Sequence, residues 1–354
     1  MDTSIKQVIQ NFLPNREYQA ETISNGLVNT TLKIFANENS EAFILQKINT
    51  QTFSQPALLQ QNYRYLSAQL TAAGSRFQLP SIISTFNSKD LFIAANKEVW
   101  RMFRYIPNSY TPVQVQTPEH AHEVALSFSR LTLDLAYSDS NKVHPVIANF
   151  HNLSFRHQQL QDAIKTNAAG RLPEAKKILE ALEAYQPLLL FYKKLNAGSK
   201  AFRKYILHHD AKLSNILFDK TTHKVVTPID MDTTMPGYFF SDAGDMIRSM
   251  AGSTDENDAC CSNIHINRNH YQAIEEGYLA NLGRIFTKEE NNFFHLSGLL
   301  LAYMQCIRFI ADYINGDIYY NTTHRQQNLE RAANQLTLLQ QLEFFVKEEY
   351  KVGI

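Results

Sequence analysis

The sequence predicts an α+β fold of two lobes, a small strand-rich amino-terminal lobe and a larger, mainly helical carboxy-terminal lobe. Short strand-like runs dominate the first hundred residues. From Pro118 onward the apolar residues recur mostly at helical spacing, interrupted only by a strand, a loop and a hairpin around Asp210. A chain of 354 residues is long enough for such a unit. We therefore expect one lobe over residues 1–106 and a second over residues 107–354.

The amino-terminal lobe is predicted to contain one helix and four strands. The helix spans residues 56–72, where apolar side chains recur at helical spacing. A proline and polar residues follow the last strand, so residues 104–109 are the expected hinge. The strands are expected at residues 31–35, 42–48, 92–95 and 98–103.

In the second lobe, a polar loop lies between two apolar strands. The strand 205–207 leads into the loop, and the strand 216–218 leads out of it. A polar hairpin over residues 219–224 follows, and a third strand, 225–229, ends at Asp230. The loop is therefore expected to be a short turn held between buried segments.

This loop carries His208, Asp210, Lys212 and Asn215, spaced as in the H-x-D-x-K-x-x-N catalytic loop of eukaryotic-type kinases. In that loop the Asp accepts the proton of the attacking hydroxyl, the Lys neutralises the moving phosphoryl group and the Asn holds Mg²⁺. Four specified residues at fixed spacing arise by chance at on the order of one position in 10⁵. The loop thus predicts phosphoryl transfer, with Asp210 and Lys212 as catalytic residues and His208 as a structural brace.

The chain resembles the aminoglycoside phosphotransferase and choline kinase superfamily, the small-molecule relatives of protein kinases, from about Gly26 to its last helix. Within that superfamily it is most similar to bacterial N-acetylhexosamine 1-kinases. The resemblance implies a two-lobed protein-kinase-like fold, with ATP and Mg²⁺ as cofactors. It also implies phosphorylation of the anomeric hydroxyl of N-acetylglucosamine or N-acetylgalactosamine. The narrower likeness rests on residues 229–237, 242–248, 308–320 and 328–332.

On the nucleotide side, the resemblance implies that the loop before the first strong strand covers the ATP phosphates through backbone N–H groups. Gly26, Asn29 and Thr30 lie in this loop, although an Asn-Gly pair is also common in plain turns. Adenine would be recognised by backbone at the hinge, which includes Phe103, Arg104 and Tyr105.

The strand 42–48 is expected to supply the cation for the α- and β-phosphates. Lys47 alternates with Phe43 and Leu45 on one face, although a shift of one residue would turn Gln46 inward instead. The helix over residues 56–72 has no acidic residue in its first two turns, unlike the helix of a protein kinase. Gln60 or Gln61 is expected to supply a neutral hydrogen bond in its place.

For the metal, Asn215 and Asp230 offer the oxygen ligands that Mg²⁺ accepts. Asp232 shares a strand face with Asp230 by two-residue periodicity, so it is expected to assist the metal or the acceptor. The next residue, Thr233, resembles a family position near the reacting phosphate. Farther along, Asp242, Asp245 and Arg248 fall at helical spacing, which favours a buried ion-pair brace.

For the acceptor, Arg308 and Asp312 lie within an apolar helical run, where a charged side chain needs a partner or a ligand. The resemblance places Arg308 and Tyr319 near the sugar, and Asp317, which lies between them in sequence, and Thr233 are also expected to bind the substrate. An internal salt bridge between Arg308 and Asp312 is the structural alternative. Residues 149–156 also resemble a family segment, without an assigned role.

The composition restricts the class of partner. The chain has 34 basic and 34 acidic residues, which argues against nucleic acid or an anionic membrane surface as the main partner. The amino terminus lacks the pattern of a signal peptide, and the apolar window over residues 295–314 contains charged residues, as in a buried helix. Three cysteines cannot form a disulfide framework, so a reduced cytoplasm is the expected compartment.

Two other functions fit parts of the sequence. Within the kinases, an aminoglycoside, a choline-like amine or another sugar is an alternative acceptor. A pseudokinase that binds nucleotide and acts as an interaction module is the alternative outside the enzymes. The absence of the helix acid favours a pseudokinase, whereas the presence of Asp210, Asn215 and Asp230 opposes it.

Overall fold

The computed structural model describes residues 3–14, 16–25, 28–36, 41–254 and 256–353. Two compact units divide the chain. The first comprises residues 1–111, 137–148 and 216–235, and the second comprises residues 112–136, 149–215 and 236–354. The strand end that carries Asp230 therefore belongs to the first unit, whereas the sequence order had assigned it to the second lobe.

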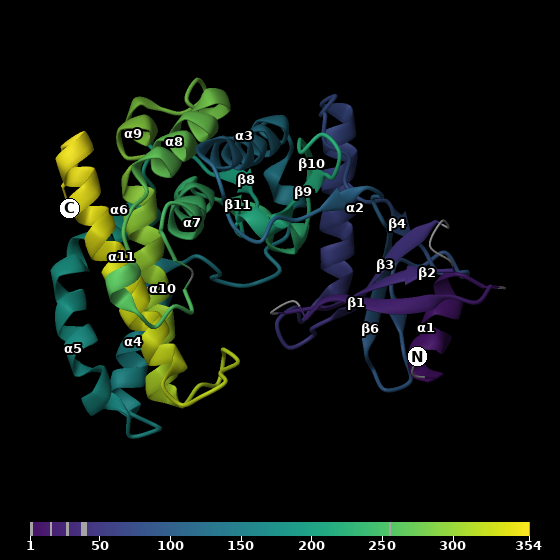
Figure 1. The fold of residues 1–354 in the computed structure, drawn as a ribbon, viewed down its shortest axis with the longest axis horizontal. Helices are drawn as coiled ribbons and strands as arrows, with labels where there is room; N and C mark the ends of the chain where they lie inside the picture. The colour runs from purple at the N-terminus through teal and green to yellow at the C-terminus, as the bar shows by residue number, and fades with distance from the viewer. Residues whose placement is uncertain (1–2, 15, 26–27, 37–40, 255, 354) are drawn as a thin grey trace. The chain divides into compact units, whose positions relative to one another are not determined.

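An antiparallel sheet is the frame of the first unit (Figure 1). Its strands lie in the order β1-β2-β3-β6-β4, and β5 also pairs with β6. The bounds are β1 (Gln19–Asn25), β2 (Thr30–Phe35), β3 (Ala42–Ile48), β4 (Ile82–Ile83), β5 (Phe92–Ile93) and β6 (Val99–Arg104).

One face of this sheet packs against α1 (Thr3–Phe12). Val8 and Ile9 of the helix share an apolar core with Leu45 of β3 and Trp100 of β6. Because strand side chains alternate between faces, Lys47 points to the same side as Leu45. The Lys47 ammonium lies 5.9 Å from the centre of the Trp100 ring, which is consistent with both side chains lying on the α1 face of the sheet.

The opposite face packs against α2 (Pro56–Ala72). Tyr63 of this helix contacts Phe103 of β6, with 4.8 Å between ring centroids. Gln46 and Arg101 are directly paired across β3 and β6, and alternation turns both toward α2. The sheet register thus places Gln46 and Lys47 on different faces.

A second sheet of the first unit presents the strand end that precedes Asp230. Its order is β10-β9-β7, and the β9–β10 connection is the predicted hairpin. Asp219 closes the turn, because its Oδ1 accepts the backbone N–H groups of Thr221 and Thr222 at 2.9 and 2.7 Å. The bounds are β7 (Ser109–Tyr110), β9 (Ile216–Asp219) and β10 (Val225–Pro228), with the 3-10 turns η1 (Ser140–Lys142) and η4 (Met231–Thr233) in the same unit.

The second unit is mainly helical. Its packing pairs include α3 with α8, and α10 with α4, α7 and α11. Thr117 begins α3, since its side chain accepts the backbone N–H of His120 and Pro118 occupies the first turn. The helices are α3 (Pro118–Asp134), α4 (Leu153–Thr166), α5 (Leu172–Leu182), α6 (Gln186–Asn196), α7 (Phe240–Met250), α8 (Arg268–Leu282), α9 (Lys288–Asn292), α10 (Leu296–Asn315) and α11 (Gln327–Tyr350). The shorter elements are η2 (Glu183–Tyr185), β8 (Tyr205–Leu207), η3 (Leu213–Asn215), η5 (Cys261–Asn263) and β11 (Met235–Gly237), where the chain passes between units.

The apolar window near the carboxy terminus forms α10, which is buried on most sides. Gly298 lets this helix approach its neighbours, because a Cβ there would lie 2.6 Å from Ile247. Gly316 ends the helix in the left-handed conformation, with φ of 96°. Over the described residues, no helix has the length and apolar character needed to cross a membrane.

The predicted elements are largely confirmed. The helix over residues 56–72 and the strands over 42–48 and 205–207 have the predicted bounds, and the other predicted strands shift by a few residues at most. The sequence analysis did not predict α1 or β1, although the apolar residues of α1 recur at helical spacing.

Candidate active site

The predicted catalytic loop forms η3 and the turn before it, between β8 and β9. The Lys212 ammonium lies 2.9 Å from the Asp210 carboxylate. The side-chain amide of Asn215 donates to the Asp210 Oδ2 at 2.7 Å and to its backbone oxygen at 2.8 Å. The structure thus brings together the three predicted residues of the second unit.

Asp210 is held in its ionised form. Burial by itself would raise the pKa of its carboxyl group, but the charge of Lys212 and the hydrogen bonds from Lys212 and Asn215 lower it below the ordinary value. Its side chain is 27% exposed, so a ligand can reach it. An aspartate of this kind orients a hydroxyl and takes its proton late, as a loose phosphoryl-transfer transition state requires.

Asp242, at the start of α7, braces the backbone of this loop. Its two carboxylate oxygens accept the N–H groups of His208 at 3.1 Å and His209 at 2.7 Å. Burial raises the pKa of Asp242 to about 6, opposed by the charge of His208 and by these hydrogen bonds. His209 adopts a left-handed conformation with φ of 63°, and Gly237 leaves room for its ring, since a Cβ there would lie 2.3 Å away. Asp242 thereby fixes the residues that immediately precede Asp210.

The expected ion-pair brace is confirmed for two of its three members. Arg248 donates to the Asp245 carboxylate at 2.8 and 3.1 Å, and to Glu256 at 2.9 Å. His208 is fully buried, and its ring contacts Phe128 of α3 with 5.1 Å between centroids. These contacts support the structural role predicted for His208.

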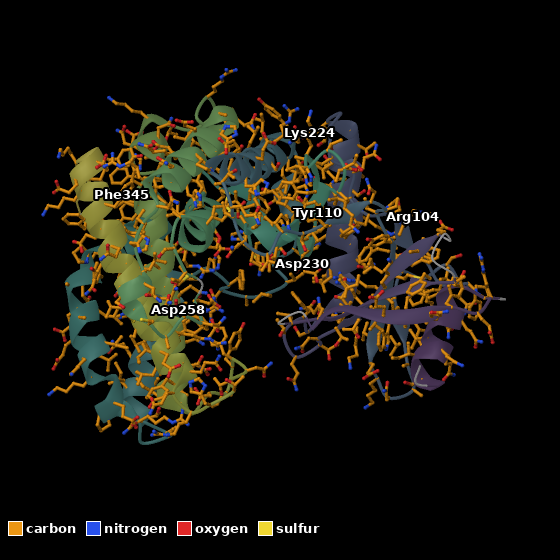
Figure 2. All side chains as sticks on the ribbon, in the orientation of Figure 1. Arg104, Tyr110, Lys224, Asp230, Asp258 and Phe345 are labelled. Atoms are coloured by element: carbon orange, nitrogen blue, oxygen red, sulfur yellow. The ribbon has the colours of Figure 1, made fainter. Side chains whose placement is uncertain are left out.

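At the end of β10, Asp230 and Asp232 occupy different environments. Asp230 is labelled in Figure 2, and its side chain is exposed. It is left-handed, with φ of 59° and ψ of 54°, and it immediately precedes η4 without a side-chain capping hydrogen bond. Asp232 is buried, and Arg101 donates to its two oxygens at 2.7 Å each. Asn29 also donates to Asp232, at 3.1 Å. Both oxygens of Asp232 are therefore engaged by protein donors, which makes it a poorer candidate than Asp230 for a metal ligand.

Arg101 is a buried cation on the α2 face of the sheet. Its side chain is 2% exposed, and its Nε donates to the Gln46 Oε1 at 3.0 Å. Gln60 of α2 accepts a longer contact of 3.4 Å from the same guanidinium. Gln60 thus lies where the sequence predicted a neutral helix partner, but the cation is Arg101.

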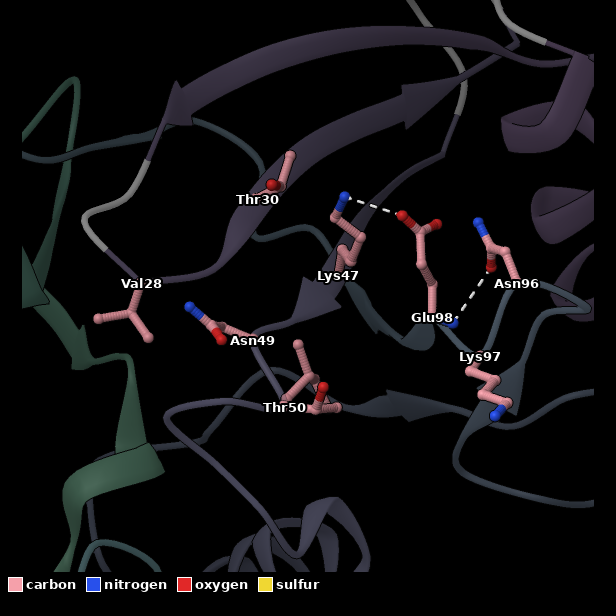
Figure 3. A pocket seen from close by; sticks show the side chains of 9 residues that line it. Val28, Thr30, Lys47, Asn49, Thr50, Asn96, Lys97 and Glu98 are labelled. Atoms are coloured by element: carbon pink, nitrogen blue, oxygen red, sulfur yellow. Dashed lines mark hydrogen bonds and ion pairs between the residues drawn. The ribbon is translucent and has the colours of Figure 1, made fainter. Parts of the chain in front are cut away.

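The predicted phosphate cation, Lys47, lies on the other face. Its side chain is 38% exposed, and its ammonium is 3.0 Å from Glu98 (Figure 3). A pocket of about 430 Å³ contains Lys47 together with Thr30, another predicted nucleotide contact. Its lining residues are Val28, Thr30, Lys47, Ile48, Asn49, Thr50, Asn96, Lys97 and Glu98.

The expected hinge follows β6. Phe103 is buried, and Arg104 is exposed and forms an ion pair with Glu41 (Figure 2). The backbone N–H of Tyr105 donates to the carbonyl of Ala42 at 3.0 Å. Gly26, the remaining nucleotide-side prediction, lies outside the described residues.

In the second unit, Arg308 lies among aromatic rings. Its guanidinium carbon is 5.4 to 5.9 Å from the centres of the rings of Phe150, Tyr319 and Tyr320, and it donates to Gln305. Over the described residues, Arg308 makes no ion pair. The hydroxyl of Tyr320 is likewise buried without a hydrogen-bond partner among those residues. These groups form a cationic, aromatic cluster with polar groups available to a ligand.

The alternative salt bridge of Arg308 with Asp312 is not formed. The Asp312 carboxylate instead accepts the backbone N–H groups of Ile318, Tyr319 and Tyr320 at 2.8 to 3.0 Å. It also accepts the side-chain amide of Asn328 at 3.0 Å. Asp312 therefore shapes the loop after α10.

Asp317, predicted to bind the acceptor, is used within the protein. Its carboxylate forms an ion pair with Arg171 and accepts the side-chain amide of Asn328 at 2.9 Å. The structure does not bring its carboxylate to Arg308. Thr233, which was also predicted to bind the substrate, ends η4 in the first unit.

Residues 149–156, which had no predicted role, supply part of the surroundings of Arg308. Phe150 stacks on His151, with 4.4 Å between ring centroids. Burial lowers the pKa of His151, and nearby His209 and Arg308 lower it further. Burial and Arg308 also lower the pKa of Arg156, to about 10. The structure thus adds a second arginine near Arg308.

The residues present fit Mg²⁺ in their donor chemistry. Asn215 uses its amide N–H groups to hold Asp210, which leaves the amide oxygen as the atom suited to a metal. Asp230 offers an exposed carboxylate in the first unit. Over the described residues, no cluster of three His, Cys, Asp or Glu side chains forms a self-contained metal site. An amide oxygen and a carboxylate are donors that Mg²⁺ accepts, since it binds through few protein groups, waters and phosphates.

Sequence reasoning missed Arg101, Asp242 and Tyr320. A charged residue in the apolar run 99–103 was a usable signal for Arg101, because an arginine there must find a buried partner. Asp242 was predicted to be buried, but the pattern of residue types does not show that its carboxylate accepts backbone N–H groups. Tyr320 was named only as part of the aromatic run after Gly316.

Comparison with known proteins supports this description. Residues 19–272 match the sequence model of the phosphotransferase enzyme family. The chain is similar to a microcompartment-associated aminopropanol kinase at 17% identity, with a TM-score of 0.65 and 98% of each chain covered. It is similar to a spectinomycin phosphotransferase in complex with ADP and spectinomycin at 12% identity, with a TM-score of 0.60 over 96% of this chain and 97% of the other. It is also similar to a choline kinase from Cryptosporidium parvum Iowa II at 15% identity, with a TM-score of 0.54 over 99% of this chain and 97% of the other. These likenesses confirm the predicted two-lobed kinase-like fold.

Proposed function

Because the chain belongs to the phosphotransferase enzyme family, we propose that it is an ATP- and Mg²⁺-dependent kinase of a small molecule, and that its acceptor is the anomeric hydroxyl of an N-acetylhexosamine. The observation that carries the proposal is the arrangement of Asp210, Lys212 and Asn215. An ionised carboxylate, a cation and an amide oxygen at this spacing are the groups that phosphoryl transfer requires.

Each residue has a defined part in the proposed reaction. Asp210 accepts a hydrogen bond from the acceptor hydroxyl and takes its proton as the phosphoryl group moves. Lys212 neutralises charge on the transferred group, and it holds Asp210 ionised beforehand. Asn215 and Asp230 would hold Mg²⁺, which would supply positive charge to neutralise the phosphate oxygens.

The surroundings of Arg308 support a neutral sugar as the acceptor. A guanidinium without an ion-pair partner among the described residues can donate to hydroxyl or acetamido oxygens. The rings of Phe150 and Tyr319 suit the C–H face of a sugar, and Tyr319 is 57% exposed. The unpartnered hydroxyl of Tyr320 offers a further hydrogen bond.

The same charges oppose an amine acceptor. A choline-like or aminoglycoside ammonium next to Arg308 and Arg156 would meet two guanidinium groups. Among the described residues, neither arginine has a carboxylate in an ion pair that could offset this repulsion. A kinase of cationic acceptors is therefore the weaker alternative, and another neutral sugar is the stronger one.

A panel of acceptors tests the proposal. Purified protein is incubated with ATP, Mg²⁺ and one free sugar or amine at a time, and the product is identified by mass. We expect phosphorylated N-acetylglucosamine or N-acetylgalactosamine, no product from a sugar methylated at the anomeric oxygen, and no product from choline. The Asp210→Asn variant is the matched control for contaminating kinases. Phosphorylation of choline or an aminoglycoside alone would overturn the assignment of the acceptor, and ATP binding without any turnover would favour a pseudokinase.

A further inference from the structure

The first unit contains a buried charged pair that the proposed reaction does not use. Arg101 of β6 and Asp232 of η4 are 2% and 6% exposed, and two hydrogen bonds of 2.7 Å join them. A bidentate arginine–carboxylate pair fixes the orientation of both groups as well as their distance. Removing one partner would leave a buried charge without compensation, which is strongly unfavourable.

The pair joins five segments of the unit. Arg101 donates to Gln46 of β3 at 3.0 Å and approaches Gln60 of α2 at 3.4 Å. Asp232 accepts the side-chain amide of Asn29, and the Asn29 oxygen accepts the backbone N–H of Asn49 at 3.0 Å. The predicted phosphate loop, the two central strands and the helix are therefore all connected to η4 through one guanidinium and one carboxylate.

The predicted metal ligand, Asp230, lies two residues before Asp232 in the chain. Asp230 immediately precedes η4, and it is held in a left-handed conformation that is unfavourable for a residue with a Cβ. Asp232, two residues later, is held by three protein donors. The fixed position of Asp232 limits how Asp230 can turn.

We propose that Arg101 and Asp232 are positioning residues, which orient Asp230 and the Asn29 loop for Mg·ATP in place of the lysine–acid pair that β3 and α2 lack. In this arrangement Asp232 acts through Arg101 and is not a metal ligand. Lys47 cannot substitute for Arg101, because it lies on the opposite face of the sheet and pairs with Glu98. The inference rests on the proposed function for its kinetic test.

Three variants separate the possible roles of this pair. Arg101→Met, Asp232→Asn and the double variant are compared with wild type for kcat, for KM of the acceptor and for the Mg²⁺ concentration at half-maximal rate. We expect each single variant to lower kcat by about 10²-fold, as for a small misplacement of a reacting group. We expect both to raise the Mg²⁺ requirement by similar factors, and the double variant to be no worse than the worse single one. The acceptor KM should change little.

Other outcomes would overturn the proposal. If Asp232→Asn raised the Mg²⁺ requirement and Arg101→Met did not, Asp232 would be a metal ligand. If both variants lowered the melting temperature but kept wild-type kcat and Mg²⁺ dependence, the pair would be structural only. Arg101→Lys keeps the charge without the bidentate geometry, so it should fold and show an intermediate kcat, which keeps the test informative if Arg101→Met does not fold.

The first unit offers a matched control. Arg64 of α2 also donates two hydrogen bonds to a carboxylate, that of Asp90, but its side chain is 57% exposed. Arg64→Met should leave kcat and the Mg²⁺ requirement unchanged.

A thermal-shift measurement with ADP, with and without Mg²⁺, needs no acceptor. If wild type turned over no acceptor, the proposed function would fail. The positioning role would then still predict that Arg101→Lys and Asp232→Asn lose the Mg²⁺-dependent part of the ADP-induced shift, and retention of that part would refute it.

Discussion

The Asp312 carboxylate accepts the backbone N–H of Tyr319 at 2.8 Å. This hydrogen bond fixes the loop that carries Tyr319, whose ring lies beside Arg308. These two charged residues of α10 are one helical turn apart, and the sequence offered a salt bridge between them as an alternative to a ligand site. The hydrogen bonds from the loop after α10 go to Asp312 and not to Arg308, so the two charged residues have different contacts. Asp312 shapes the backbone of the loop, and Arg308 is not paired with it.

Arg308→Leu should raise the KM for N-acetylglucosamine or N-acetylgalactosamine by roughly tenfold or more, with little change in the KM for ATP. A site built to hydrogen-bond hydroxyl groups loses affinity when a charged donor is removed. Both KM values and the melting temperature are measured on one preparation. A destabilised protein with wild-type sugar KM would remove Arg308 from the site.

The control for this variant is Asp317→Asn. Asp317 pairs with Arg171 and Asn328, so its substitution should lower the melting temperature while the sugar KM stays within a few-fold of wild type. A large rise in sugar KM without loss of stability would restore the substrate-binding role that the sequence predicted for Asp317.

Asp210→Asn should lower kcat by about 10²-fold or more while ATP still binds. The amide cannot take up the acceptor proton, and the lost general base accounts for an effect of this size. Steady-state rates and nucleotide affinity are compared in the same buffer. Activity within a few-fold of wild type would contradict the role of Asp210.

Asp230→Ala should abolish turnover and weaken binding of Mg·ATP more than binding of free ATP. The variant removes the exposed carboxylate at the start of η4, which is the predicted metal ligand of the first unit. Nucleotide affinities with Mg²⁺ and with a chelator give the comparison. Equal affinity of wild type for ATP with and without Mg²⁺ would count against a metal-dependent site.

The rate should fall as the pH is lowered through about 6, because Asp242 then becomes protonated. Its ionised carboxylate accepts the N–H groups of His208 and His209, so the brace is complete above that pH and weakened below it. The pKa of Asp210 is lowered, so Asp210 stays ionised over the same range. His208, Asp245 and Tyr278 are the other titratable groups facing Asp242.

Asp242→Asn tests the origin of this pH dependence. The single amide oxygen cannot replace both carboxylate oxygens that accept the N–H groups of His208 and His209, so kcat should be lower at every pH. Because the amide does not titrate, the fall in kcat near pH 6 should disappear. Profiles of kcat at saturating ATP and acceptor are recorded for both proteins between pH 5 and pH 8. An unchanged fall near pH 6 in the variant would assign it to another group.

The catalytic loop was predictable because its chemistry is local. Asp210, Lys212 and Asn215 lie within six residues, and their contacts follow from one short turn between two strands. The strand 42–48 and the helix 56–72 were predictable for a similar reason, since alternation and helical spacing record which side of an element is buried.

The identity of the cation facing α2 was not predictable in this way. The alternation of β3 favoured Lys47 together with Phe43 and Leu45, and a shift of one residue would have turned Gln46 to that side instead. Pairing of β3 with β6 settled the register, and it turned Arg101 toward α2. The partners of Asp317 and Asp312 were likewise not predictable from the spacing of residues. Asp317 pairs with Arg171, and Asp312 accepts hydrogen bonds from Asn328 and from backbone N–H groups.

The sequence by itself determined the two-lobed α+β fold, the phosphoryl-transfer loop and the placement of Arg308 in a buried helix. Each depends on residues that are close in the chain and on a hydrophobic periodicity that a single element must obey. Only the tertiary structure decided that Asp232 pairs with Arg101, since the two residues meet through separate strands and loops of one unit. A buried charge needs a partner, but the chain carries many candidates, and only packing selects one.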